Sequence, residues 1–267
     1  MPHAQSLIFT PFENLPANLS LPEAFNCSWN DAPHPLSLLA AERLQSHLRQ
    51  QTQWQHNFGL TPGAEGPVIG KMFGVLVVRT EQGALGYLSA FSGKLAGGNY
   101  HSGFVPPLYD GVDEQGFLTA GMRQLSRISE EIKVLEASGD PSGKERAKRL
   151  KEVRKNHSNA LQQEIFEQYH FLNEAGESKS LVALFEAAGY KNPPAGAGEC
   201  AAPKLLQYAF EHKMQPLAMA EFWWGLSPKS ASWQHGRFYG PCREKCAPIL
   251  AHMLPDLIWP AGEEKGL

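Results

Sequence analysis

A pair of apolar segments between residues 71 and 91 constrains the fold of this chain more than any other feature of its sequence. Residues 71–79 are almost continuously apolar, and residues 84–91 form a second apolar segment after the short connection Glu81-Gln82-Gly83. Two such segments joined by a Gly-containing loop predict a β-hairpin. An uninterrupted apolar strand is typically buried, so this hairpin should lie in the interior of the protein.

The rest of the sequence predicts helices around this hairpin and at least one further strand. Residues 216–224 are apolar and bounded by Pro and Gly, as in a strand, whereas residues 36–54, 199–210 and 242–254 predict helices. We therefore expect an α/β fold of the α+β type, a small mixed sheet flanked by helices. The chain has 267 residues, of which 42% are apolar, so it is long enough to bury a core.

A helical hairpin is expected to interrupt this α/β core. Apolar residues repeat at helical spacing on both sides of Gly139-Asp140-Pro141-Ser142-Gly143, which breaks the pattern. This predicts two antiparallel helices over residues 120–175, inserted between the core segments 36–119 and 176–267. Residues 1–35 are rich in Pro and Asn and predict an extended arm packed over the body. The isolated aromatic residues of this arm are Phe9, Phe12, Phe25 and Trp29.

The second arm of the helical hairpin carries a run of basic residues. Between positions 144 and 155, seven Lys or Arg stand against two Glu, and such a row can follow an RNA backbone through phosphate contacts. A solvated helix face is the alternative. The net charge of −3 confines any RNA-binding surface to a local region. The candidate RNA-binding residues are Lys144, Arg146, Lys148, Arg149, Lys151, Arg154 and Lys155.

Three of the four cysteines fall in the last quarter of the chain, and four are too few for a disulfide framework. Cys200 begins one predicted helix, and Cys242 and Cys246 lie one helical turn apart at the start of another. Thiolates at helix N-termini suit zinc, and His235 could supply a fourth ligand. Two alternatives remain open: the thiols could be buried as small apolar groups, or Cys242 and Cys246 could form a redox pair.

The order of these elements resembles the core of the zinc-dependent nucleobase deaminases: a hairpin, a helix that begins at Cys200, a strand, and a helix after Pro241-Cys242. The resemblance implies that Cys200, Cys242 and Cys246 hold a zinc ion. Ala202 stands where that family has its catalytic Glu, and the second motif is Cys-x-x-x-Cys rather than Cys-x-x-Cys. These departures favour a structural metal site over an active deaminase.

Two further positions are candidates for chemistry or binding. Glu221 lies at the end of an apolar strand, where a carboxylate is costly to bury unless it is paired or used in chemistry. It is our candidate acid/base residue, and pairing with an Arg or Lys is the alternative. Gly196 and Gly198 would allow a ligand to approach the N-terminus of a helix, where anions are favoured, with Lys204 one turn inside. A tight structural turn is the alternative there.

Several long stretches resemble the N-terminal extension of a group of large bacterial RluA-type pseudouridine synthases. The resemblance covers nearly the whole chain but not the catalytic part of that family, whose Asp nucleophile follows Arg-Leu. Here Arg43-Leu44 is followed by Gln45, and Arg149-Leu150 by Lys151. The matching stretches are HPLSLLAAE (34–42), QWQHNFGL (53–60), GKMFGVL (70–76), GYLSAFSGKL (86–95), PPAGAGECAAPKLL (193–206), PLAMAEFWWG (216–225) and CREKC (242–246).

These resemblances imply a non-catalytic RNA-binding accessory module, related to the N-terminal part of pseudouridine synthases and able to bind zinc. Two alternatives are a zinc-dependent deaminase acting on a nucleobase or nucleotide, and a protein-interaction domain that uses the helical hairpin. The expected partners are structured RNA and a pseudouridine synthase catalytic chain. The longest apolar run is too short to span a membrane and the N-terminus lacks the features of a signal peptide, so we expect a cytoplasmic protein.

Overall fold

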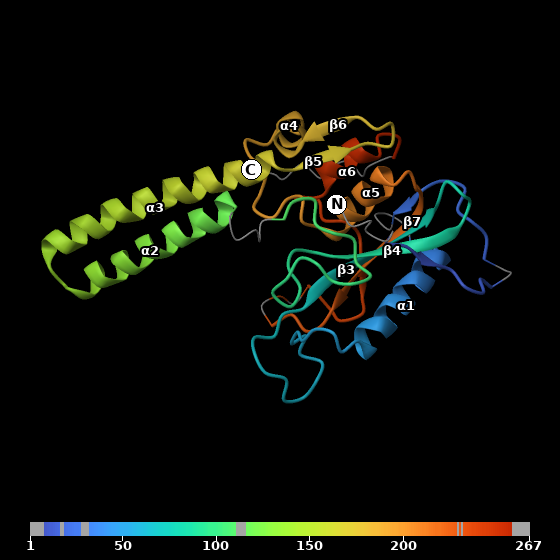
Figure 1. Ribbon diagram of the computed structural model, residues 1–267, viewed down its shortest axis with the longest axis horizontal. Coiled ribbons are helices and arrows are strands. Elements are labelled where there is room, and N and C mark those ends of the chain that lie inside the picture. The colour runs from blue at the N-terminus through green and yellow to red at the C-terminus, as the bar shows by residue number, and fades with distance from the viewer. Residues whose placement is uncertain are drawn as a thin grey trace, which may run out of the picture.

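The predicted β-hairpin lies at the centre of the main sheet. Strand β3 (Lys71–Arg79) pairs antiparallel with β4 (Leu85–Phe91), and Gly83 turns the chain between them at a φ of 83°, which favours glycine. Strand β7 (Gln215–Trp224) lies antiparallel on the other side of β3 (Figure 1). The computed structural model describes residues 8–16, 19–27, 32–110, 116–228, 230 and 232–257.

Short strands complete this sheet at its edges. Strand β1 (Thr10–Pro11) pairs antiparallel with β4, and β2 (Asn26–Cys27) pairs parallel with β7. Strand β8 (Phe238–Tyr239) also pairs with β7, and the strand order is β1-β4-β3-β7-β2. Parts of the predicted N-terminal arm therefore join both edges of the sheet, whereas Trp29 lies outside the described residues.

The buried side chains of β3 alternate between two cores because successive residues of a strand point to opposite faces. Phe73 and Val77 pack with α1 (Pro35–Gln50) on one face. Leu76 packs with α5 (Ala201–Glu211) on the other. Helices thus cover both faces of a mixed sheet, and the predicted α+β class is confirmed.

The last helix begins later than the sequence predicted. Helix α6 spans Ala247–Met253, whereas a helix from Cys242 was expected. A helix that already included Glu244 would bring its carbonyl against the ring of Pro248, four residues on. The chain instead forms a turn in which the Cys246 N–H donates to the Cys242 carbonyl at 3.1 Å, and Pro248 falls in the first turn of α6, where proline is tolerated.

The predicted helical hairpin is present and projects from the rest of the molecule (Figure 1). It consists of α2 (Phe117–Ala137) and α3 (Pro141–Glu167). Gly139, at a φ of 70°, reverses the chain between them. The Asp140 carboxylate caps α3 by accepting from the Gly143 N–H at 3.1 Å.

This helical hairpin is shorter than the predicted range 120–175 because the chain returns to the body as a strand. Strand β5 (His170–Leu172) pairs antiparallel with β6 (Ser178–Ser180) in a second, two-stranded sheet, and α4 (Leu181–Ala187) follows directly. Phe171 is fully buried in the core that also contains α5 and α6. These elements therefore extend the α5 side of the body.

Candidate metal centre and adjoining pocket

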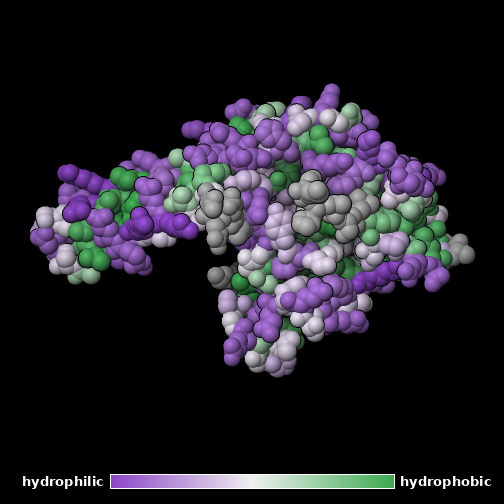
Figure 2. Space-filling model, in the orientation of Figure 1, coloured by the Kyte–Doolittle hydropathy of each residue, from purple (hydrophilic) through white to green (hydrophobic). Residues whose placement is uncertain are grey.

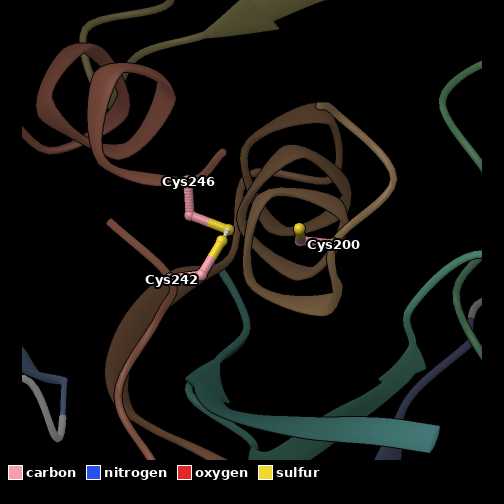
Figure 3. Close-up of side chains that lie close together, drawn as sticks. All are labelled: Cys200, Cys242 and Cys246. Atoms are coloured by element: carbon pink, nitrogen blue, oxygen red, sulfur yellow. Dashed lines mark hydrogen bonds between the residues drawn. The ribbon is translucent and has the colours of Figure 1, made fainter. Parts of the chain in front are cut away.

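Three cysteine side chains converge at the N-termini of α5 and α6. The Sγ atoms of Cys200, Cys242 and Cys246 all lie within 4.8 Å of one another. Those of Cys242 and Cys246 are 3.4 Å apart (Figure 3). Cys246 is buried, and the other two are partly exposed. The sequence-based prediction that these three residues could reach one ion is therefore confirmed at the level of geometry.

The end of β4 holds Cys200 in position. Cys200 is the N-cap residue of α5. The next residue, Ala201, donates its N–H to Ser92 Oγ at 3.2 Å. The Gly93 N–H donates to the Glu199 carbonyl at 2.9 Å. The first turn of α5 is thus attached to the segment that follows β4.

The donor set fits zinc. A zinc–thiolate bond is about 2.3 Å long, so two sulfurs of a tetrahedral site lie about 3.8 Å apart. Three Sγ atoms within 4.8 Å of one another therefore need only small shifts to bind one ion. Thiolates select soft or borderline metals such as zinc rather than magnesium or calcium. Three protein ligands also leave one coordination position open, as in catalytic zinc sites.

The three thiols differ in pKa. Hydrogen bonds with Cys200 and Cys246 lower the pKa of the Cys242 thiol. Hydrogen bonding with Cys242 raises the pKa of Cys200, and hydrogen bonding with the other two thiols raises that of Cys246. Cys242 is thus the first of the three to ionise, because its neighbours donate to the thiolate. A preformed thiolate is the group that a metal ion binds first.

His235 lies apart from this cluster. Its Nδ1 accepts from the Gly225 N–H at 3.0 Å, and its ring packs on Trp224 with centroids 4.4 Å apart. His235 precedes strand β8, and the pairing of β8 with β7 places this segment near the end of β7. The short sequence distance between His235 and Cys242 therefore does not bring the histidine to the cysteine cluster. Among the residues described, no fourth His, Cys, Asp or Glu ligand atom lies within 4.8 Å of all three thiols.

Glu221 lies beside the cysteine cluster. Its side chain is buried, and its Oε1 accepts from the Ala202 N–H at 3.3 Å. Burial raises the pKa of the Glu221 carboxyl to about 8, and the charge of Cys242 acts in the same direction. Among the described residues, no Lys or Arg lies within ion-pair distance of Glu221. The structure therefore does not show the pairing with a Lys or Arg that was the alternative role for this residue.

The position of Glu221 can be compared with the deaminase pattern that the sequence resembles. That family has its Glu two residues after the first ligand, where this chain has Ala202. Here the backbone N–H of Ala202 is the group that binds Glu221. The strand thus supplies a carboxyl next to the position that lacks one. Because the two residues are 19 positions apart, no motif spacing could have revealed the pairing.

A small pocket adjoins the cluster through the first turn of α5. Lys204 lines it and is only 4% exposed, with its Nζ 4.5 Å from the centroid of the Phe91 ring. Burial lowers the pKa of Lys204 to about 8. Glu199 and Tyr169 also line the pocket, and the Tyr169 hydroxyl donates to Glu199 Oε1 at 3.4 Å. Tyr169 follows α3, and no pattern in the sequence around it predicted that its side chain would line this pocket.

The basic residues of α3 are exposed, but several are already partnered. Arg146 pairs with Glu131 at 2.5 Å, and Lys151 pairs with Glu136 at 2.6 Å, both across to α2. Arg149 pairs with Glu145 on its own helix, and Arg154 donates to Ser129. Within the described ranges, three of the seven candidates carry no ion pair or side-chain hydrogen bond. These three are Lys144, Lys148 and Lys155.

Comparison of the chain with protein-family models, with curated proteins and with solved structures finds no match. The resemblances to pseudouridine synthases and to deaminases therefore stay predictions from the sequence. Among the helices of the described residues, none is both long enough and apolar enough to cross a membrane.

Proposed function

We propose that Cys200, Cys242 and Cys246 hold a zinc ion at which this protein removes an amino group from a nucleobase by hydrolysis. The observation that carries the proposal is the placement of a buried carboxyl, Glu221, beside three converging thiols. Such a group is costly to keep in a protein interior without a partner or a role. The reaction converts the ring unit N=C–NH2 and water into HN–C=O and ammonia.

The roles of the residues follow from their positions. Zinc bound by three protein ligands supplies a Lewis acid with one open coordination position. Glu221 would carry the protons: its carboxylate takes one proton of the attacking water to the adjacent ring nitrogen and the second to the departing amino group. The Ala202 N–H donates to Glu221 Oε1, which orients the carboxyl. Strand β7 thus provides the acid/base group that the deaminase family places on its helix.

Ammonia release tests this proposal. The zinc-loaded protein should release ammonia from at least one member of a panel of cytosine-, adenine- and guanine-containing nucleosides, nucleotides and short RNAs. An enzyme-coupled ammonia assay under steady-state conditions detects this, with product identified by mass spectrometry as a loss of NH and a gain of O. Full zinc occupancy without turnover on the whole panel would leave the metal a structural role alone.

A second candidate function, RNA binding, is favoured by the partner-free lysines of α3. Lys144, Lys148 and Lys155 are four and seven residues apart in turn, so they share one face of a helix with 3.6 residues per turn. They lie on a hairpin that projects from the body (Figure 1) and has a largely hydrophilic surface in the view of Figure 2. Such a row suits the phosphates of structured RNA. The proposal that a pseudouridine synthase chain is a partner rests on the resemblance alone.

Charge reversal on this face should weaken RNA binding. The double variant Lys148→Glu/Lys155→Glu is expected to lower affinity for a structured RNA about tenfold or more at moderate salt, because each lost phosphate contact also removes counterion release. The slope of log affinity against log salt should fall by roughly 1–2. Fluorescence anisotropy measures both. The variant Lys179→Glu/Lys191→Glu changes charge equally at exposed positions outside the hairpin, and equal losses in the two variants would contradict a binding role for α3.

A further inference from the structure

The pocket beside α5 contains a charged group without a polar partner. Lys204 is 4% exposed and lines the pocket. Across the described residues, its ammonium takes part in no hydrogen bond and no ion pair. Its contact with the face of the Phe91 ring, 4.5 Å from the centroid, offsets part of the cost of burial. A buried ammonium needs a hydrogen-bond acceptor to replace the water it has lost. A ligand bound in the pocket can supply that acceptor.

Charged groups of both signs surround Lys204. Lys71 and Glu199 both act on it electrostatically, the first as a like charge and the second as an opposite one. The Tyr169 hydroxyl already donates to Glu199 Oε1 at 3.4 Å, so part of the carboxylate is engaged. Cys200, one turn before Lys204, is the other titratable group that interacts with it. The charged side chains that line the pocket are Lys204 and Glu199, one of each sign, and Lys71 adds a positive charge from outside the lining.

The backbone of α5 contributes no free donor in its first turn. The N–H of Ala201 donates to Ser92 Oγ, and that of Ala202 donates to Glu221 Oε1. Pro203 has no N–H. The positive end of the helix can still favour an anion at this place, but the hydrogen bond has to come from a side chain. Lys204 is the side chain in position to donate it.

The size of the pocket limits what it can hold. Its empty space is about 270 Å³ with the part that is open to solvent included, so the enclosed space is smaller than this. Gly198 forms part of its wall at a φ of 90°, and a Cβ there would lie 2.8 Å from Tyr169 Cδ1. The wall is therefore closely packed at this point. A pocket of this size suits a single small group better than a whole nucleotide.

We propose that this pocket binds one phosphate group, with Lys204 Nζ as its principal donor and Lys71 adding to the positive field. Phosphate binding itself does not rest on the proposed hydrolysis, since no metal ligand takes part. Combined with that function, it makes the substrate of the metal centre a phosphorylated one, a nucleotide or a segment of RNA, rather than a free base or nucleoside.

Calorimetric titration of the full-length protein with inorganic phosphate tests the proposal. Saturable binding is expected in both the metal-free and the zinc-loaded protein. Lys204→Met, which keeps most of the unbranched side chain and removes the charge, should weaken phosphate binding about tenfold or more, as expected for a charge-assisted hydrogen bond. Glu199→Gln should strengthen it severalfold, because the opposing charge is gone. Lys94→Met, an exposed lysine next to the pocket segment, is the matched control and should change nothing.

Two results would overturn the inference. The first is the absence of phosphate binding to the wild-type protein, and the second is an affinity that is unchanged in both Lys204→Met and Glu199→Gln. If Lys204→Met fails to fold, Glu199→Gln still decides the question. Titrations with a nucleoside 5′-monophosphate, its nucleoside and a short single-stranded RNA then distinguish the source of the phosphate. Because these are binding measurements, they stand whether or not ammonia is ever released.

Discussion

Replacing Glu221 by glutamine should abolish ammonia release while leaving zinc content and fold intact. Glutamine has the same shape and can still accept from the Ala202 N–H at its Oε1, so the contact at 3.3 Å can persist. It cannot take up and return a proton. General acid–base catalysis contributes about 10²–10⁴-fold in enzymes, so kcat should fall by at least about 100-fold. KM should change little, since Glu221 is expected to act in the chemical step.

The same variant should not destabilise the protein, because an amide is cheaper to bury than a carboxylate. Steady-state kinetics, elemental analysis and thermal unfolding of Glu221→Gln, side by side with wild type, give the three readouts. Glu186→Gln, an exposed substitution on α4, is the matched control and should behave as wild type. Retention of full activity in Glu221→Gln would remove this residue from the mechanism, and loss of zinc together with activity would assign it to the metal site instead.

Chelation of the metal should lower the thermal midpoint of the wild-type protein by about 10 °C. An ion present at 1,000 times its Kd stabilises the folded state by about 4 kcal/mol, and each kcal/mol shifts the midpoint of a chain of this size by roughly 2–4 °C. The cluster joins the N-termini of α5 and α6, and Cys246 is buried in their shared core. Loss of the metal should therefore lower the stability of the whole α/β body.

Cysteine variants separate metal binding from packing. Cys242→Ser should have the lowered midpoint of the chelated protein and show no further effect of a chelator. Cys27→Ser is a close match, because Cys27 and Cys242 are both partly buried and pack against the same core, yet Cys27 is not part of the cluster. It should still respond to chelation as wild type does. If wild type and Cys242→Ser had equal midpoints with and without chelator, the cysteines would be packing residues.

The sheet could be predicted because its signals are local. The apolar segments at 71–79 and 84–91 and the turn between them specify a hairpin without reference to the rest of the chain. The start of α6 was predicted wrongly at Cys242, since Pro248 excludes a helix that begins so early. The separate sheet of β5 and β6 was not foreseen, because three-residue strands carry too few residues for a pattern.

The site was predicted in part, and the features that were not predicted share one cause. The cysteines could be placed together because Cys200 begins one predicted helix, Cys242 and Cys246 lie one turn apart at the start of another, and the order of the elements resembles the deaminase core. His235 was assigned to them from sequence distance, although the pairing of β8 with β7 places it against Trp224. The contact between Glu221 and Ala202 and the pocket of Lys204 arise where separate segments pack together. Such contacts depend on tertiary structure and leave no spacing in the sequence.

Metal content is the measurement that tests the central claim most directly. Elemental analysis is made on protein produced without a histidine tag and dialysed against metal-free buffer. We predict about one zinc per chain in the wild type and in Cys27→Ser, as for a site with one ion on three thiolates, and none in Cys242→Ser. Zinc-free wild-type protein that takes up no zinc when it is supplied, or equal zinc content in wild type and Cys242→Ser, would contradict the assignment of this cluster as a metal centre.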